Sequence, residues 1–520
     1  MMSVICLSLL PLMFKESTPL LHGLDRAIAM VSSLFGIAIV ALPAGIITAG
    51  YMKELEKEKE AEQKQAEEEQ RRRDKTEPKP LYHSAISLGG IAMAENTDIR
   101  LQTQVIYSIY IRAHTPEGTF RAVIPDLDRI RDLGTDIIWF MPIHPIGEQG
   151  KKGSLGCPYA NRDYRSVNPA YGTLEDFRTL VDEIHRRGMK VLIDVVYNHT
   201  SPDAVLFAEH PEFYYRDAEG KPGNKFGNWA DVIDLDYRVK TLWDYQIESL
   251  RFWAGIVDGF RCDVASLVPL EFWKAARKAV AEVRPDCIWL AETVHRSFAA
   301  LARRQGFHAM RDTEAFEAFD IEYDYDVREA FDKVLRKTAP LSAWLDLLDF
   351  QEAAYPANYN KLRCLENHDQ PRIASVLRDE AALINYTAML YFLKGTVLLY
   401  GGQEFEDEHL PSLFEKEPID RDTGKDLSPL LRRLGEIRKT YFSGEDSFWG
   451  QAEDGQRIAV LRRGNCAGVF SLDARPGLVR LEERLEIPDG RYEDLLGGEP
   501  VTVEAGMLRC GGGPAIFRLT

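Results

Sequence analysis

Apolar and polar positions follow two alternating rhythms along most of the chain. Eight short apolar stretches, rich in β-branched and aromatic residues, predict strands. They lie at 105–111, 136–141, 190–196, 258–264, 287–292, 318–323, 362–367 and 396–401. The segments between them, such as "TLEDFRTLVDEIHRRG" and "VPLEFWKAARKAVAEV", have the apolar spacing of amphipathic helices. Eight strand–helix units in succession predict an α/β fold, the parallel (β/α)8 or TIM barrel.

A long apolar stretch near the N-terminus has a different pattern. No charged residue occurs from Ala27 to Met52, "AIAMVSSLFGIAIVALPAGIITAGYM", which is long enough for a transmembrane helix. More basic residues follow this span than precede it, so the positive-inside bias places its C-terminal side in the cytoplasm. The charged segment from Lys53 predicts a solvated helix, which Pro78 and Pro80 end.

Composition narrows the function without changing this organisation. Of the 520 residues, 45% are hydrophobic and 28% are charged, as in an ordinary globular protein. The net charge of −17 argues against nucleic acid as a partner. The 7 cysteines are scattered singly, which indicates reduced thiols rather than a disulfide framework or a zinc site.

Polar residues gather where the predicted strands end. They are Asp194, Asn198 and His199 in "DVVYNHTS", Arg261 and Asp263 in "GFRCDVAS", Glu292 in "LAETVH", and His368 and Asp369 in "ENHD". In a parallel barrel the carboxyl ends of the strands share one face, and active sites form there. The pattern therefore predicts that these carboxylates and histidines converge on one cavity.

Arg261 and Asp263 pose a sharper question because they stand two residues apart in an apolar run. Residues i and i+2 of a strand point to the same face. One interpretation is a structural ion pair. The other is a carboxylate that the guanidinium holds ionised and fixes in one rotamer.

The strand-end residues resemble those of the alpha-amylase family of glycoside hydrolases. The resemblance runs from about Gln104 to the end of the chain, and four separated motifs occur in the family's order. Further matches are "CPYANRDYRSVNPAYGT" (157–173), "DVIDLDY" (231–237) and "YGGQEF" (400–405). The resemblance implies a retaining glycosidase that acts on starch-derived glucans or maltooligosaccharides through α-glucosidic bonds.

The resemblance also implies a role for each site residue. Asp263 corresponds to the nucleophile, Glu292 to the acid and base, and Asp369 to a third carboxylate that grips the sugar. The substrate-binding residues that it implies are Tyr159, Asp194, His199, Arg261 and His368. Tyr159 is expected to stack on the sugar, and Trp229 is a weaker candidate for a more distant sugar subsite.

The sequence patterns and the family resemblance also predict the domain boundaries. We expect a transmembrane segment at 1–52, a charged helix and linker at 53–92, and the catalytic barrel at 93–445. A short loop insertion after the third strand is expected at about 197–236. By resemblance, an antiparallel β domain follows at 446–520.

The sequence departs from the family's pattern at two places, which concern calcium binding and the glucosidic linkage that is cleaved. The stretch after the nucleophile is "DVASLVP", without the Lys-His of many relatives. Calcium could bind at Asn198, but the insertion is short with few evident ligands, so we expect no required cofactor. After the first strand, "AHTPEGTFRAVIPDL" lacks the Asp-rich metal loop of many alpha-glucosidases in the family, which favours α-1,4-linked substrates.

The N-terminal span resembles the last transmembrane helix of bacterial voltage-gated-type potassium channels. The similar residues are "TPLLHGLDRAIAMVSSLFGIAIVALPAGIITAGYM", with Gly36 and Pro43 where such helices bend. No "TVGYG"-like filter precedes them, so a working channel is not expected. Our hypothesis is a channel remnant joined to a separate enzyme, by a real fusion or a gene-boundary error.

The same residues are compatible with two functions other than glycoside hydrolysis. A glucan transglycosylase would use the same residues, because the acceptor alone decides between water and sugar. A non-catalytic barrel like the transporter heavy subunits would also carry a membrane helix, but it would not need Asp263, Glu292 and Asp369. The expected location is the cytoplasm, or the cytoplasmic face of the membrane if residues 27–52 are retained.

We predict that residues 1–92 are dispensable for catalysis, because every proposed catalytic residue follows them. A chain beginning at Met93 is expected to fold cooperatively and to act on α-glucans at the rate of the full chain. Specific activities of the two chains on maltooligosaccharides provide the measurement. An inactive short chain beside an active full chain would make the N-terminal region part of the enzyme.

Overall fold

The computed structural model describes residues 94, 97–226 and 229–519. The predicted transmembrane segment, the charged helix and the channel-like stretch lie outside these residues. Among the helices within the described ranges, none is long and apolar enough to cross a membrane.

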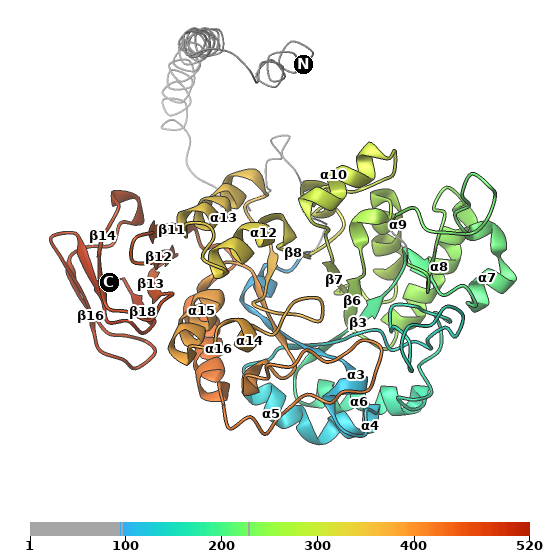
Figure 1. Ribbon diagram of the computed structural model, residues 1–520, viewed down its shortest axis with the longest axis horizontal. Helices are drawn as coiled ribbons and strands as arrows, with labels where there is room; N and C mark the ends of the chain where they lie inside the picture. The colour runs from blue at the N-terminus through green and yellow to red at the C-terminus, as the bar shows by residue number, and fades with distance from the viewer. Residues whose placement is uncertain (1–93, 95–96, 227–228, 520) are drawn as a thin grey trace, which may run out of the picture. The chain divides into compact units, whose positions relative to one another are not determined.

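Eight parallel strands close into a barrel, coloured from blue to orange in Figure 1. They are β1 (Val105–Ile109), β2 (Ile137–Phe140), β3 (Lys190–Val195), β6 (Gly259–Cys262), β7 (Ile288–Ala291), β8 (Ile321–Tyr323), β9 (Lys361–Arg363) and β10 (Thr396–Tyr400). Each strand pairs with the next barrel strand along the chain, and β10 pairs with β1. The predicted (β/α)8 barrel is confirmed: seven of the eight predicted stretches contain one barrel strand each, and the stretch 362–367 overlaps β9, which begins one residue earlier.

Strand β9 is shorter than predicted. The apolar run suggested a strand to residue 367, but β9 ends at Arg363. The chain then turns into a loop that Glu366 holds, since its two carboxylate oxygens accept hydrogen bonds from Arg372 Nη1 and Ile373 N, both at 2.6 Å. His368 and Asp369 therefore lie in this loop rather than at the strand's last residues.

Helices surround the barrel (Figure 1). They are α3 (Ile111–His114), α4 (Phe120–Val123), α5 (Leu127–Asp132), α6 (Leu174–Arg186), α8 (Lys240–Ala254), α9 (Leu270–Val280), α10 (Arg296–Arg304), α11 (Asp312–Ala315), α12 (Tyr325–Leu335), α13 (Ser342–Ala354), α14 (Ile373–Val376), α15 (Glu380–Phe392) and α16 (Ser428–Tyr441). Short 3-10 turns are η2 (Ile99–Thr103), η3 (Ile124–Asp126), η5 (Ala265–Leu267) and η6 (Gln403–Phe405). The predicted helix "TLEDFRTLVDEIHRRG" is α6, and Thr173 and Asp176 form a capping box at its start.

Side-chain alternation along the strands builds two apolar layers. Inward residues such as Ile106, Trp139 and Leu290 fill the barrel interior. Outward residues such as Phe140 and Phe260 pack in a larger cluster with the helices. The interior is therefore a packed core, and only its carboxyl end is available for chemistry.

A short insertion follows β3. It contains β4 (His199–Thr200), α7 (Val205–Glu209), η4 (Pro211–Phe213) and β5 (Ile233–Asp234). Strands β4 and β5 pair antiparallel, with His199 opposite Asp234. This pairing holds His199 close to the end of β3.

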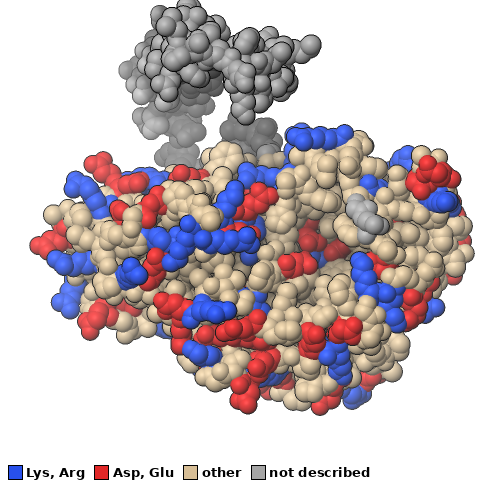
Figure 2. Space-filling model, in the orientation of Figure 1, with Lys and Arg blue, Asp and Glu red and all other residues tan. Residues whose placement is uncertain are grey.

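The C-terminal part consists of two antiparallel four-stranded sheets. One contains β11 (Phe448–Glu453), β12 (Ile458–Arg463), β13 (Cys466–Ser471) and β18 (Ala515–Arg518); the other contains β14 (Gly477–Arg480), β15 (Gly490–Tyr492), β16 (Val501–Glu504) and β17 (Met507–Cys510), with η7 (Glu483–Leu485) between β14 and β15. The antiparallel arrangement that the family resemblance implied is confirmed. On the face shown in Figure 2, acidic and basic side chains are interspersed.

Candidate active site

Arg261 lies at the centre of the strand-end residues, on the inward face of β6. Its side chain has no solvent exposure. Strands β3 and β6 pair in a register that sets Asp194 directly beside Arg261. Both residues alternate with outward neighbours, so both side chains point into the barrel.

Three carboxylates converge on this one guanidinium. Nη1 of Arg261 donates to Asp194 Oδ1 and Oδ2 at 2.9 and 3.1 Å and to Asp263 Oδ1 at 2.9 Å. Nη2 lies 2.9 Å from Glu292 Oε2, where the angle suits an ion pair rather than a directed hydrogen bond. The cluster joins the ends of β3, β6 and β7, so the predicted convergence is confirmed for these three carboxylates.

Aromatic rings enclose the remaining faces of the guanidinium. The Arg261 Cζ atom lies 5.2 Å from the Trp139 ring centroid, 5.6 Å from that of Tyr159 and 5.4 Å from that of Tyr323. The Tyr323 hydroxyl also accepts from Arg261 Nε at 3.3 Å. Cation–π attraction and packing therefore restrict Arg261 to one rotamer.

Burial raises the pKa of two carboxyl groups in this cluster. The pKa of Glu292 is raised to about 8, chiefly by burial; Arg261 lowers this pKa, and the charges of Asp263 and Asp369 raise it. Burial likewise raises the pKa of Asp194 to about 7, against the lowering effect of Arg261. Three buried carboxylates share one cation, so at neutral pH the cluster favours holding a proton.

Hydrogen bonding decides where that proton is best placed. Both oxygens of Asp194 accept from donors, because Arg261 contacts each and the Tyr159 hydroxyl donates to Oδ2 at 3.0 Å. Glu292 Oε2 accepts from Val264 N at 2.7 Å, whereas Oε1 has no hydrogen-bond partner among the described residues. The geometry therefore assigns the shared proton to Glu292 and leaves Asp194 ionised.

The loop after β9 brings His368 and Asp369 beside this cluster. The Tyr159 hydroxyl lies 2.8 Å from His368 Nε2, and the two rings stack with centroids 5.4 Å apart. Asp369 Oδ2 lies 3.1 Å from the same Nε2, and its side chain is 44% exposed. Burial lowers the pKa of His368, so its ring is neutral at pH 7. Asp369 is therefore the carboxylate of the set that is most open to solvent.

His199 occupies a neighbouring position in β4. Its ring centroid lies 6.1 Å from that of Trp229, and its Nδ1 is 3.2 Å from Asn198 Nδ2. Within the described residues, no hydrogen bond joins the His199 ring to Arg261 or its carboxylates. His199 thus lies near the cluster because β4 follows β3 closely along the chain, and not through a hydrogen bond to the cluster.

The surroundings of Asn198 bear on whether a cation could bind there. Asn198 Nδ2 donates weakly to Asp234 Oδ1 at 3.4 Å. Lys225 places its ammonium 2.7 Å from the Leu235 carbonyl, and its backbone N–H donates to Asp234 Oδ2 at 2.7 Å. The nearby ammonium opposes a second cation, so these donors fit calcium poorly. Over 97–226 and 229–519, no three His, Cys, Asp and Glu side chains are grouped to hold a metal.

Sequence reasoning missed Trp139, Tyr323 and Val264 of this site. Tyr323 hydrogen-bonds Arg261 from β8, and its inward position in a predicted strand was the available signal. Val264 donates its backbone N–H to Glu292 from a left-handed conformation. No side-chain pattern indicates a main-chain donor, so the sequence carried no signal for it.

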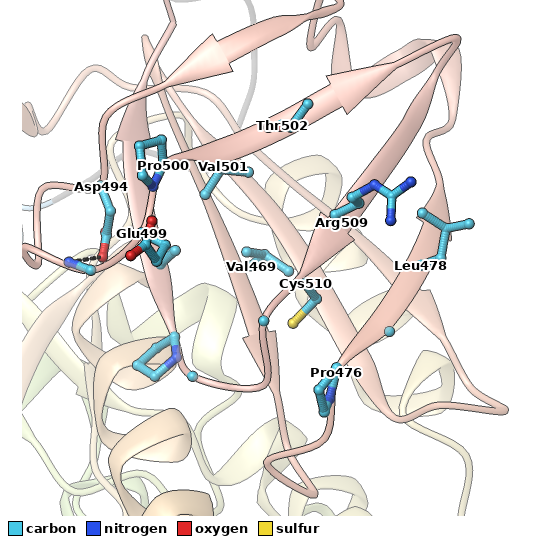
Figure 3. Close-up of a pocket in the computed structure, with 16 residues that line it drawn as sticks. Val469, Pro476, Leu478, Asp494, Glu499, Pro500, Val501, Thr502, Arg509 and Cys510 are labelled. Atoms are coloured by element: carbon cyan, nitrogen blue, oxygen red, sulfur yellow. Dashed lines mark hydrogen bonds between the residues drawn. The ribbon is translucent and has the colours of Figure 1, made fainter.

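A separate cavity of about 590 Å³ lies in the C-terminal sheets (Figure 3). Glu499 and Arg509 lie on opposite sides of a floor that includes Val469, Val501 and Cys510. The cavity contains none of the strand-end residues of the barrel. The candidate active site is therefore the cluster of Arg261 and its carboxylate partners at the carboxyl end of the barrel.

Two family models match this chain. The family described as "Alpha amylase, catalytic domain" matches residues 64–428, and "Bacterial Alpha amylase C-terminal domain" matches 452–517. The chain is 28% identical over 344 residues to an intracellular maltogenic amylase of Bacillus subtilis, covering 62% of this chain and 55% of that protein. It is 28% identical over 366 residues to an alpha-1,4-glucan:maltose-1-phosphate maltosyltransferase of Streptomyces coelicolor, covering 63% and 51%. The chain thus spans about half the length of these curated relatives.

A solved structure shows the same similarity over more of the chain. An alpha-amylase from Lactobacillus plantarum is 41% identical, with a TM-score of 0.76. The match covers 81% of this chain and 100% of that one.

We predict that Arg261→Met destabilises the fold in a pH-dependent manner. Removing one partner of a buried ion pair costs about 3–5 kcal/mol. Without the cation, the folded-state pKa values of Asp194 and Glu292 rise further above their unfolded values. The folded state then binds more protons than the unfolded state, so stability falls as pH rises from 5 to 8.

Urea unfolding at pH 5 and pH 8 measures this loss. Arg186→Met is the matched control, because Arg186 pairs with Glu183 on the surface of α6 and is 65% exposed. The control should change stability little at either pH. Equal losses at both pH values for Arg261→Met would contradict the proposed sharing of protons.

Proposed function

The chain belongs to the alpha-amylase family of glycoside hydrolases and is an enzyme of the glycosidase type; from that premise we propose that it cleaves α-1,4-glucosidic bonds in starch-derived glucans or maltooligosaccharides with retention of configuration. Proteins of this family act on α-glucosidic bonds by hydrolysis or transfer. The observation that carries the proposal is Arg261, which binds Asp263 and Glu292 through its two terminal nitrogens. A retaining mechanism needs two carboxyl groups about 5–5.5 Å apart, and both of these carboxylates lie within ion-pair distance of the same guanidinium.

Asp263 serves as the nucleophile. Its Oδ1 accepts the hydrogen bond from Arg261, and its Oδ2 has no hydrogen-bond partner among the described residues. The guanidinium stabilises the ionised form and fixes its orientation. The free oxygen attacks the anomeric carbon of the sugar and forms a covalent glycosyl–enzyme ester as the glycosidic bond breaks.

Glu292 serves as acid and then as base. The pKa raised by burial keeps it protonated at neutral pH, so it donates a proton to the departing glycosidic oxygen. In the second step it takes a proton from water, which attacks the anomeric carbon and releases Asp263. Two inversions leave the product in the α configuration.

The surrounding residues bind and orient the sugar. Asp369 is exposed and accepts hydrogen bonds from sugar hydroxyls, while His368 and His199 supply further polar contacts. Tyr159 offers an aromatic face beside the cluster. Asp194 acts through Arg261 and Tyr159, since its two oxygens hold both side chains in place.

Hydrolysis and transfer differ in the acceptor that attacks the glycosyl–enzyme ester. The acceptor is water in hydrolysis and a second sugar in transfer. A relative named as a maltosyltransferase supports the transglycosylase alternative, because the same two carboxylates serve both reactions. The non-catalytic barrel is disfavoured, since the glycosidase family and the intact carboxylate cluster both argue for catalysis. We also propose a cytoplasmic location, as the name of the intracellular maltogenic amylase suggests. We propose further that the enzyme requires no metal.

We predict that Asp263→Asn lowers kcat on maltooligosaccharides by about 10³-fold or more while the protein stays folded. The amide keeps the shape of the side chain but cannot attack the anomeric carbon. In wild-type reactions, proton NMR should show α product first. A variant that kept more than a few per cent of wild-type activity, or fresh β product, would reject this nucleophile or the retaining scheme.

We predict that Glu292→Gln lowers the rate on maltooligosaccharides by about 10²–10⁴-fold. The first chemical step on α-maltosyl fluoride should change far less, because fluoride leaves without protonation. For the wild type, kcat/KM on maltooligosaccharides should fall as pH rises through about 8, where Glu292 loses its proton. Equal losses on both substrates would argue that Glu292 is not the acid.

A further inference from the structure

Val264 follows the proposed nucleophile in an unusual backbone conformation. Its φ and ψ angles are 35° and 46°, in the left-handed region. A β-branched residue rarely adopts this conformation, because its Cβ crowds the backbone. Such strain persists where the surrounding structure imposes it, and it is concentrated at functional sites.

The left-handed turn points the Val264 N–H at the proposed acid. Asp263 N still donates to Val195 O at 3.0 Å, so the barrel ladder continues to the nucleophile. One residue later, Val264 N donates to Glu292 Oε2 at 2.7 Å. The turn then closes with Leu267 N donating to Val264 O at 2.9 Å. The reversal therefore links the loop after β6 to the acid at the end of β7.

This hydrogen bond distinguishes the two oxygens of Glu292. Oε2 receives the Val264 N–H and lies 2.9 Å from Arg261 Nη2. A proton on Oε2 would face two donors, so the transferable proton belongs on Oε1. The N–H also stabilises the charged form of Glu292 and opposes the rise in its pKa that burial causes.

Apolar packing holds Val264 in this conformation. Its half-buried side chain packs against a cluster formed by Phe226, Leu267, Ala299, Ala302 and Ala309. Phe226 comes from the insertion after β3, and Ala299 and Ala302 come from α10. The insertion and α10 thus brace the strained residue from outside the barrel.

We propose that Val264 is a positioning residue, whose braced main-chain N–H holds Glu292 Oε2 so that Oε1 alone presents the catalytic proton to the glycosidic oxygen. This inference rests on the proposed function, in which Glu292 is the acid. Val264 touches no substrate in this role and acts only through Glu292.

Val264→Gly tests the proposal in the full chain. Glycine keeps the N–H but loses the bracing side chain and reaches many other φ values. The kcat/KM on maltotriose should fall about tenfold, while the value on α-maltosyl fluoride stays within about twofold. The basic limb of the maltotriose pH profile should move up by about 0.5–1 pH unit, because Glu292 loses a hydrogen bond to its charged form.

Val280→Gly is the matched control. Val280 ends α9 and is buried in the large outer cluster, not in the cluster that packs against Val264. This variant should lower the melting temperature and leave the substrate ratio and the pH limb unchanged. If Val264→Gly does not fold, Val264→Ala takes its place and should shift the limb in the same direction.

The outcomes separate this proposal from the proposed function. A wild type inactive on both maltotriose and α-maltosyl fluoride would reject the function itself. An active wild type, with a Val264→Gly variant that loses equally on both substrates and keeps its pH limb, would reject only the positioning role. The same rejection follows if Val280→Gly moves the limb as far as Val264→Gly does.

Discussion

The site depends on one buried cation and the number of carboxylates that share it. Arg261 has no exposed surface, and desolvating a guanidinium is costly unless its charge is compensated. Asp194 and Asp263 compensate it by hydrogen bonds and Glu292 by an ion pair. Because three negative groups exceed one positive charge, the cluster retains a proton. An arrangement that stabilises the folded barrel thereby also supplies an acid beside an ionised nucleophile.

The barrel explains why these groups can meet at all. Asp194, Arg261 and Glu292 belong to β3, β6 and the end of β7, which are adjacent strands of the closed sheet. Parallel strands bring their carboxyl ends to one edge, and the inward alternation of side chains directs them to the axis. Aromatic rings of Trp139, Tyr159 and Tyr323 then fill the space around the guanidinium. The meeting of these groups at one end of the barrel is therefore a consequence of strand register.

The loops after β6 and β9 place further groups around the residues that the strands position. The loop after β9 is held by the ion pair between Glu366 and Arg372, with side chains that are almost fully buried, and it carries His368 against Tyr159. The turn after β6 aims the Val264 N–H at Glu292 and is braced by apolar residues of α10 and the insertion. Substrate-facing groups thus come both from the barrel strands and from the loops that follow them. The nucleophile and its cation lie on the barrel, whereas Asp369 lies on a more exposed loop.

Much of this site could be predicted from the amino-acid sequence. The eight apolar stretches determined the barrel, because alternating strands and amphipathic helices have few other ways to bury their apolar faces. The spacing of Arg261 and Asp263 predicted their contact, since residues two apart share a face of a strand. The polar strand ends likewise predicted that Asp194, Asp263 and Glu292 would converge.

Only the tertiary structure decided how these residues are connected. It joined Arg261 to Asp194 and Glu292, stopped β9 at Arg363, and brought Tyr323 under the guanidinium. It also assigned the proton to Glu292, because both oxygens of Asp194 accept hydrogen bonds whereas Oε1 of Glu292 has no partner among the described residues. Local spacing specifies contacts within one strand. Contacts between strands, the hydrogen bonds of the main chain and the sharing of protons depend on distances that only the closed barrel establishes.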